Sequence, residues 1–221
     1  MAANFSEPVK AIAAVLERTT GHTLKITVGA TGRLYAQIRN GAPFDVLLSA
    51  DAATPRKLVA EGRADGASLH DYAVGRLVLW SSNPATVRHG EALLRRGRID
   101  RLAIANPALA PYGAAAREVL QKVGRWDALQ PRLVIGENVG QTAQFVTSGA
   151  APLGLLPRSL VLEARRTTPG SGWEIPAAWH SPILQSAVLL NRGRDNAAAR
   201  GFLQYLRTAG PRARIRAFGY D

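Results

Sequence analysis

Three short segments combine a small polar or glycine-rich turn with the start of a helical pattern. They are Asn4-Phe5-Ser6-Glu7, Gly29-Ala30-Thr31-Gly32 and Pro111-Tyr112-Gly113. A helix N-terminus carries unpaired backbone N–H groups and a partial positive charge, so it is a ready anion site. Ordinary helix capping is the simpler explanation of each turn taken alone, with Asn4 as a cap and Glu7 reaching back to it. The three turns share a geometry that could hold an anion, and none of them is specific by itself.

The residue patterns of common catalytic and metal sites are missing. The chain has no cysteine, which excludes disulfides, thiol catalysis and zinc–thiolate sites. The histidines do not have metal-ligand spacing, and the sequence contains no HExxH, P-loop, GxSxG or GxGxxG motif. The acidic residues form no convincing pair for glycoside hydrolysis. We therefore expect a binding protein, with no cofactor, and not an enzyme.

The chain is strongly basic, with 28 Lys and Arg against 16 Asp and Glu and a net charge of +12. The basic residues lie in small scattered groups, at 95–98, 165–166 and 212–216, and no aromatic residues interleave with them as a nucleic-acid stacking surface would need. We expect no nucleic-acid partner. The positive field would still steer an anionic ligand toward its site.

Helical periodicity alternates with short apolar runs, which predicts an α/β fold with mostly parallel sheets. Strands near 76–80 and 183–190 flank a central block that has βαβ units of its own. This layout predicts two lobes, residues 1–78 plus 188–221 and residues 79–187, with two chain crossings and a ligand in the cleft. Further strands are expected at 24–28, 44–48, 102–105, 133–135 and 153–156, and helices at 9–19, 33–39, 54–61, 92–95, 114–123, 142–148, 196–208 and 212–218.

Several segments resemble a known family in the same order along essentially the whole chain. Among them are Ala2-Ala3-Asn4-Phe5, Asn40-Gly41-Ala42-Pro43-Phe44-Asp45-Val46, Ser49-Ala50-Asp51, Ala110-Pro111-Tyr112-Gly113 and Asn138-Val139-Gly140-Gln141. They look like the periplasmic molybdate-binding proteins of ABC transporters. The resemblance implies a type II periplasmic-binding-protein fold, with two α/β lobes and a two-crossing hinge. It also implies a monomer in the periplasm whose partner is the membrane permease.

The resemblance assigns the ligand, molybdate or tungstate, to neutral donors and not to arginine or lysine. Asn4 and Thr31 would supply donors from the first lobe, and Tyr112 and Val139 would supply backbone N–H groups from the second. Ala3 stands where relatives carry a hydroxyl residue, so only its backbone could contribute. Molybdenum would be present only as the oxyanion. Two alternatives stay open: another oxyanion such as sulfate or phosphate, and a cytoplasmic ligand-sensing domain of a transcriptional regulator.

The beginning of the chain departs from the family pattern. Members of the family have a strand before the segment that matches Ala2-Ala3-Asn4-Phe5, and that strand lies inside the first sheet. Met1 falls where this strand should end. From the resemblance we expect a strand and a signal peptide upstream of Met1.

Overall fold

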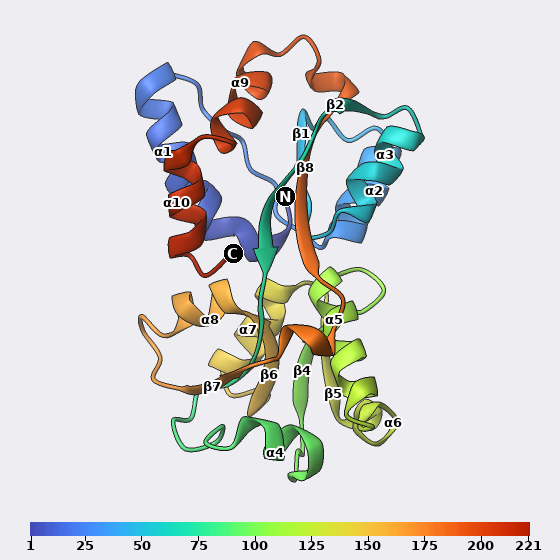
Figure 1. Ribbon diagram of the computed structural model, residues 1–221, viewed down its shortest axis with the longest axis vertical. Helices are drawn as coiled ribbons and strands as arrows, with labels where there is room; N and C mark the ends of the chain where they lie inside the picture. Colours follow the sequence, from blue (N-terminus) through green and yellow to red (C-terminus); the bar gives the residue numbers. More distant parts are fainter. The chain divides into compact units, whose positions relative to one another are not determined.

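The computed structural model describes residues 1–221, and the chain forms two compact units. Unit 1 consists of Met1–Val74 and Leu184–Asp221, and unit 2 of Gly75–Ile183. The chain therefore passes from one unit to the other twice. The sequence pattern places these passages later, after residues 78 and 187, within the strands Leu77–Ser81 and Ile183–Leu190. Figure 1 follows the chain through both units by colour.

Unit 1 has a three-stranded sheet in the order β1-β8-β2. β1 (Val46–Leu48) pairs antiparallel with β8 (Ile183–Leu190), and β2 (Ala64–Gly75) lies on the other side of β8. Helices flank both faces of this sheet, with α1, α9 and α10 on one side and α2 and α3 on the other (Figure 1). Their bounds are α1 Ser6–Thr20, α2 Thr31–Arg39, α3 Ala53–Ala60, α9 Ala197–Leu206 and α10 Ala209–Ala217.

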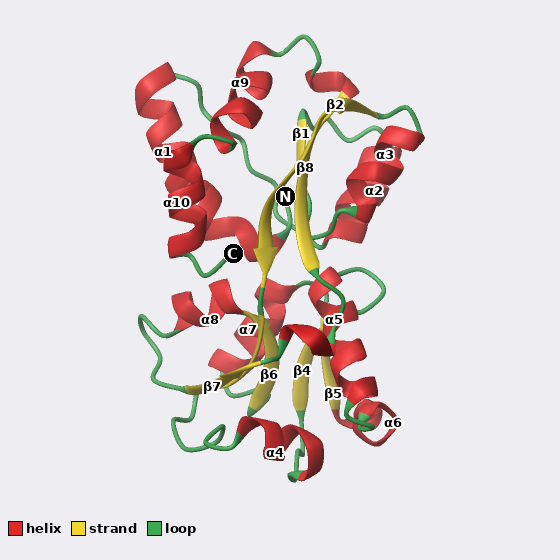
Figure 2. Ribbon diagram, viewed as in Figure 1, coloured by secondary structure: helices red, strands yellow, loops and turns green.

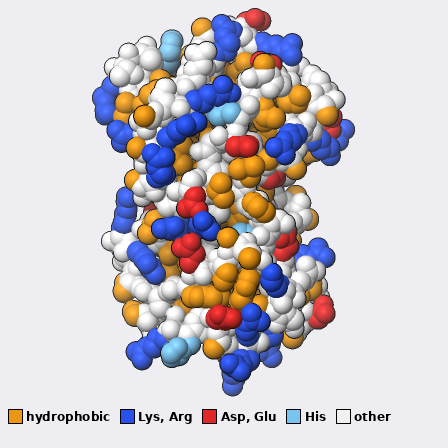
Figure 3. All heavy atoms as spheres, viewed as in Figure 1, with side chains coloured by type: hydrophobic (Ala, Val, Ile, Leu, Met, Phe, Trp, Pro, Cys, Tyr) orange, Lys and Arg blue, Asp and Glu red, His pale blue; other side chains and the backbone are white.

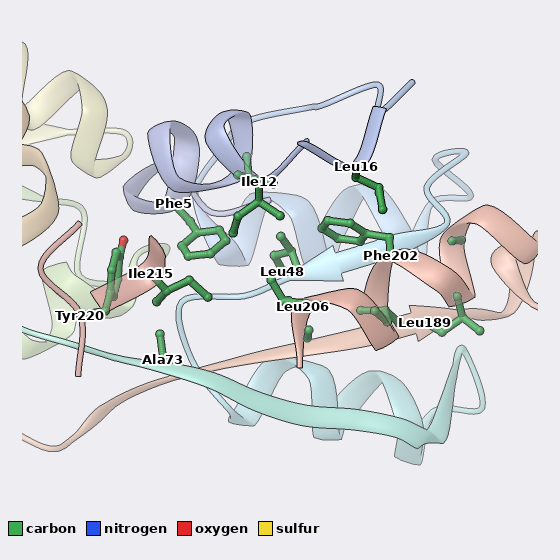
Figure 4. Packing of buried hydrophobic residues seen from close by; sticks show 14 residues of the cluster. Phe5, Ile12, Leu16, Leu48, Ala73, Leu189, Phe202, Leu206, Ile215 and Tyr220 are labelled. Carbon is green, nitrogen blue, oxygen red and sulfur yellow. The ribbon is translucent and has the colours of Figure 1, made fainter. Parts of the chain in front are cut away.

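The core of unit 1 has two parts because neighbouring strand residues point to opposite faces of a sheet. Leu48 of β1 belongs to the cluster under α1, α9 and α10, which includes Phe5, Ile12 and Phe202 (Figure 4). Leu47 belongs to a second cluster under α2 and α3. The strands of this sheet are thus covered on both faces, which explains why β8 is buried along almost its whole length.

Unit 2 has a five-stranded sheet in the order β5-β4-β6-β3-β7, with helices packed around it (Figure 2). β4 pairs in parallel with β5 and β6, whereas β3 pairs antiparallel with β6 and β7. The strands are β3 Leu77–Ser81, β4 Leu102–Ala105, β5 Leu133–Gly136, β6 Leu153–Pro157 and β7 Ser171–Glu174. The helices are α4 Gly90–Arg96, α5 Pro111–Lys122, α6 Trp126–Leu129, α7 Val139–Thr147 and α8 Arg158–Ala164.

The alternation of helices and strands confirms the α/β class, but three sequence predictions need correction. Residues 24–28 form no strand, because no strand pairs with them along their length. β2 has no counterpart among the predicted strands, because its polar residues and glycines interrupt the apolar pattern by which a strand is predicted. The sheets also contain more antiparallel pairing than expected, because β3 runs antiparallel to both of its neighbours, β6 and β7, and β8 runs antiparallel to β1.

None of the helices combines the length and the apolar character that a membrane crossing requires.

Candidate functional site

In unit 1, the segment Met1–Ala3 lies beside the turn that begins α2. Ala2 forms a parallel bridge with Gly29, and the Gly29 N–H donates to the Met1 carbonyl oxygen at 3.1 Å. Ala3 donates its own N–H to the Gly29 oxygen, also at 3.1 Å. The Ala3 backbone donor, which the sequence assigned to a ligand, is therefore occupied by the turn. This pairing brings two of the three candidate turns together within one unit.

Asn4 follows in a short 3-10 helix, Ala3–Phe5, and is only 1% exposed. Its side-chain nitrogen donates to Gln185 Oε1 at 2.9 Å and to the Tyr220 hydroxyl at 3.0 Å. The capping box is wrong: Phe5 is the N-cap of α1, with no side-chain hydrogen bond, and Glu7 pairs with Lys10 instead. Asn4 does not cap α1 because it lies inside the preceding 3-10 helix, and its side-chain nitrogen is directed to Gln185 and Tyr220. Its side chain anchors the turn inside unit 1.

A buried polar network surrounds Asn4, and its members were not anticipated from the sequence. The Tyr72 hydroxyl lies 3.1 Å from both Gln185 Oε1 and the carbonyl oxygen of Ser49. Burial, followed by the nearby Tyr220 and Asp51, raises the pKa of Tyr72 well above its ordinary value of 10.0, so the hydroxyl stays a donor. One signal was available: Gln185, followed by Ser186, is a polar residue inside a mostly apolar strand.

Thr31 is the first residue of α2 and is 2% exposed. Its Oγ1 accepts a hydrogen bond from the Ala50 N–H at 3.2 Å, which leaves the hydroxyl hydrogen to donate elsewhere. Because Thr31 opens the helix, no carbonyl oxygen within α2 can accept its backbone N–H. Thr31 can therefore offer a hydroxyl and a backbone donor at the positive end of a helix.

In unit 2, Tyr112 and Val139 lie at the starts of α5 and α7, after two adjacent parallel strands. Ala105 at the end of β4 pairs with Gly136 at the end of β5, so both helices begin at the same edge of the sheet. Tyr112 is the second residue of α5 and Val139 the first of α7. The structure therefore brings together the two residues assigned to the second lobe.

Local packing fixes each of these helix starts. A Cβ atom on Gly113 would lie 2.3 Å from the Ala105 carbonyl oxygen, so only glycine lets α5 start this close to β4. At α7, the Asn138 side chain accepts from the N–H groups of Gly140 at 2.9 Å and Gln141 at 3.1 Å. The cap thus takes the second and third N–H groups of the helix. The first belongs to Val139 and has no acceptor within α7.

The four candidate donor residues carry no charge, and the basic side chains of the chain are dispersed. In the view of Figure 3, Lys and Arg side chains are interspersed with other types over both units. Some of them form exposed ion pairs, such as Arg95 with Glu91 at 2.8 Å and Arg98 with Asp100 at 2.9 Å. No group of three or more His, Asp or Glu side chains could hold a metal ion. The geometry suits hydrogen bonding to an anion.

Comparison with known proteins places the chain in a family. Residues 1–221 match the family model described as "Bacterial extracellular solute-binding protein". The chain is 46% identical to the molybdate-binding protein ModA of Azotobacter vinelandii, covering 100% of this chain and 87% of that protein. It is also 46% identical to ModA of Rhodobacter capsulatus, covering 100% of this chain and 86% of the relative.

Solved structures of binding proteins also resemble this chain. The periplasmic molybdate-binding protein of Azotobacter vinelandii superimposes with a TM-score of 0.94 at 38% identity, covering 100% of this chain and 96% of that chain. The sulfate-binding protein SubI of Mycobacterium tuberculosis H37Rv has a TM-score of 0.79 at 14% identity, covering 99% and 84%, and shares the fold alone. These matches confirm the periplasmic-binding-protein fold. The chain belongs to the bacterial extracellular solute-binding proteins, a family of receptors and not of enzymes, and within it to the ModA group.

Proposed function

We propose that the chain is a periplasmic receptor for molybdate or tungstate that acts as a monomer and delivers the oxyanion to the permease of an ABC transporter. The observation that carries the proposal is the pair of helix starts in unit 2, where Tyr112 and Val139 open α5 and α7 at adjacent strand ends. The ModA relatives, 46% identical over the full chain, supply the identity of the anion.

The physical chemistry of the donors supports an anion held without a countercharge. A doubly charged oxyanion removed from water must have its oxygens hydrogen-bonded, because an unpaired buried charge is very costly. A hydrogen bond to a charged acceptor contributes about 1.5–3 kcal/mol, so several donors suffice. Thr31 in unit 1 and Tyr112 and Val139 in unit 2 stand at helix N-termini, where the helix dipole adds to this stabilisation.

Isothermal titration of the ligand-stripped protein tests the proposal. We expect molybdate and tungstate to bind with a stoichiometry of one anion per chain, and sulfate and phosphate to bind far more weakly. Circular dichroism of the same sample shows that the protein is folded. A folded protein that gives no heat with molybdate or tungstate would refute the proposal, and stronger binding of sulfate or phosphate would assign the site to that oxyanion instead.

A further inference from the structure

The last two helices of unit 1 carry arginines at exposed positions and no acidic residue. Residues 197–217 comprise α9, α10 and the short turn between them, and they contain five arginines but no Asp, Glu or Lys. All five arginines are exposed. We call this set the arginine face, and its members are Arg200, Arg207, Arg212, Arg214 and Arg216.

The packing of the two helices turns these arginines away from the core. Phe202 and Leu206 of α9 lie in the same buried cluster as Ile215 of α10 (Figure 4). Arg200 and Arg207 are two turns apart on the other side of α9, because residues seven positions apart share a side of a helix. The arginines of α10 flank its buried positions in the same way. Figure 3 shows Lys and Arg side chains over this part of unit 1.

No carboxylate neutralises the arginine face, because none of its members forms an ion pair. Where a guanidinium has a partner, the partner is uncharged: Arg207 donates to the Ser68 carbonyl oxygen at 3.1 Å. The positive potential extends to the neighbouring strand β2. Burial lowers the pKa of His70 on this strand, Arg207 and Arg212 lower it further, and Asp71 opposes them. The face therefore presents charge that an external anion can neutralise.

The surroundings of the arginines indicate which kind of polyanion fits. A protein–protein interface has an apolar core rich in aromatic residues. The large apolar side chains that are exposed in this chain all lie outside α9 and α10. No aromatic residue of the two helices is exposed, so the bases of a nucleic acid would have nothing to stack on. A bilayer of anionic lipids requires neither feature, because several basic side chains near its surface suffice.

We propose that the arginine face binds reversibly to the surface of a bilayer that contains anionic phospholipids, with its guanidinium groups hydrogen-bonded to headgroup phosphates. A guanidinium presents paired N–H donors that match the geometry of a phosphate. Each basic residue near such a surface strengthens binding about fivefold, so five arginines together give a measurable association. This binding would keep the receptor proposed above close to its permease, and it involves none of the oxyanion donors.

Co-sedimentation of the whole chain with lipid vesicles tests this proposal. One set of vesicles is an equimolar mixture of phosphatidylglycerol and phosphatidylcholine, and the other is phosphatidylcholine alone. At low salt we expect binding to the anionic vesicles only, and we expect this binding to fall as added salt screens the charges. Removing three charges of the face should weaken it at least about tenfold, in a variant that combines Arg212→Gln, Arg214→Gln and Arg216→Gln.

Two control variants separate the face from net charge and from folding. The first removes three positive charges from exposed arginines of unit 2 and should bind almost as the parent chain does; it combines Arg88→Gln, Arg96→Gln and Arg166→Gln. The second keeps the charges of α10 and should keep most of the binding; it combines Arg212→Lys, Arg214→Lys and Arg216→Lys. Circular dichroism of each variant shows that it is folded.

Three results would overturn the proposal. The parent chain may sediment no better with anionic vesicles than with phosphatidylcholine at low salt. The unit 2 control may lose as much binding as the α10 variant, in which case net charge and not the arginine face is responsible. The parent chain may bind soluble poly-glutamate but not the vesicles, which would assign the face to an acidic protein. All measurements are made without oxyanion, so their outcome does not depend on whether the chain binds molybdate.

Discussion

Asn4 and Tyr220, at opposite ends of the chain, exchange two hydrogen bonds. The side-chain nitrogen of Asn4 donates to the Tyr220 hydroxyl at 3.0 Å, and this hydroxyl donates to the Asn4 carbonyl oxygen at 2.6 Å. Both residues are buried, and the Phe5 and Tyr220 rings meet edge to face at 5.7 Å. The C-terminal residues thus hold the turn that leads into α1.

Replacing this tyrosine should weaken both the fold and the site. Tyr220→Phe removes the hydroxyl from a buried network and leaves Asn4 without two of its hydrogen bonds, which costs about 1–3 kcal/mol of unfolding free energy. We also expect weaker molybdate binding, because the turn at Asn4 loosens. Urea unfolding and isothermal titration measure the two effects. The matched control is Tyr35→Phe, whose hydroxyl bonds Glu61 at the surface; an equal loss of stability there would contradict the argument.

Thr31→Val separates the hydroxyl from the shape of the side chain. Valine keeps the volume but removes the oxygen that accepts from Ala50 and the hydrogen that can reach an anion. We expect molybdate affinity to fall about tenfold or more, since a hydrogen bond to a charged group is worth about 1.5–3 kcal/mol. Thr31→Ser keeps the hydroxyl and should retain most of the affinity. If both variants bind molybdate equally well in isothermal titration, the Thr31 hydroxyl takes no part in binding the anion.

The sequence predicted elements best where burial alone decides them. β4 and β8 have the predicted bounds, because both are buried along almost their whole length and are mostly apolar, with Gln185 and Ser186 the polar residues of β8. Residues 24–28 show the opposite case. Their alternating pattern is that of a strand, but a strand also needs a partner, and pairing is a property of the neighbouring chain and not of the segment.

The same limit applies to the candidate site. The helices expected to begin at residues 33 and 114, after the glycine and proline turns, begin two and three residues earlier, at Thr31 and Pro111, because the turn residues themselves join the first turn of each helix. The role of Asn4 could not be predicted, since its partners Gln185 and Tyr220 are 181 and 216 residues away along the chain. A local capping box was therefore the natural prediction, and the fold replaced it with long-range hydrogen bonds.

The cap of α7 offers a test with a matched control in the other unit. Asn138→Ala removes the acceptor of two N–H groups and should cost about 1 kcal/mol of stability. It should also weaken molybdate binding, because the first turn that presents Val139 frays. Asn196 caps α9 in the same way, accepting from Ala198 and Ala199. Asn196→Ala should lower stability similarly and leave the affinity unchanged; if both variants lose affinity alike, α7 has no special role.

Gly113→Ala tests the close approach of α5 to β4. The added Cβ would meet backbone atoms of Ala105 and Asn106 at 2.3–2.8 Å, so the start of the helix must move. We expect a loss of about 1–3 kcal/mol, as for other overpacked sites, and weaker binding through Tyr112. Gly201→Ala in α9 is the control, because a Cβ there meets nothing and alanine favours the helix. The two substitutions should shift the Tm in opposite directions.

His70 should make the stability of the fold depend on pH. Burial lowers the pKa of His70 from 6.5; Arg207 and Arg212 lower it further, while the bond to Ser68 and the charge of Asp71 oppose the shift. The folded state thus binds fewer protons than the unfolded state below pH 6.5, and the unfolding free energy must fall as the pH drops through this range.

Urea unfolding between pH 5 and pH 8 measures this dependence. His70→Gln removes the titrating ring, so its unfolding free energy should change less with pH below about 6.5. The control is His22→Gln at an exposed position, which should behave as the parent protein does. His70 Nε2 is buried without a hydrogen-bond partner, so protonation places a charge where nothing accepts it. A parent protein whose stability is flat from pH 5 to pH 7 would contradict this account of His70.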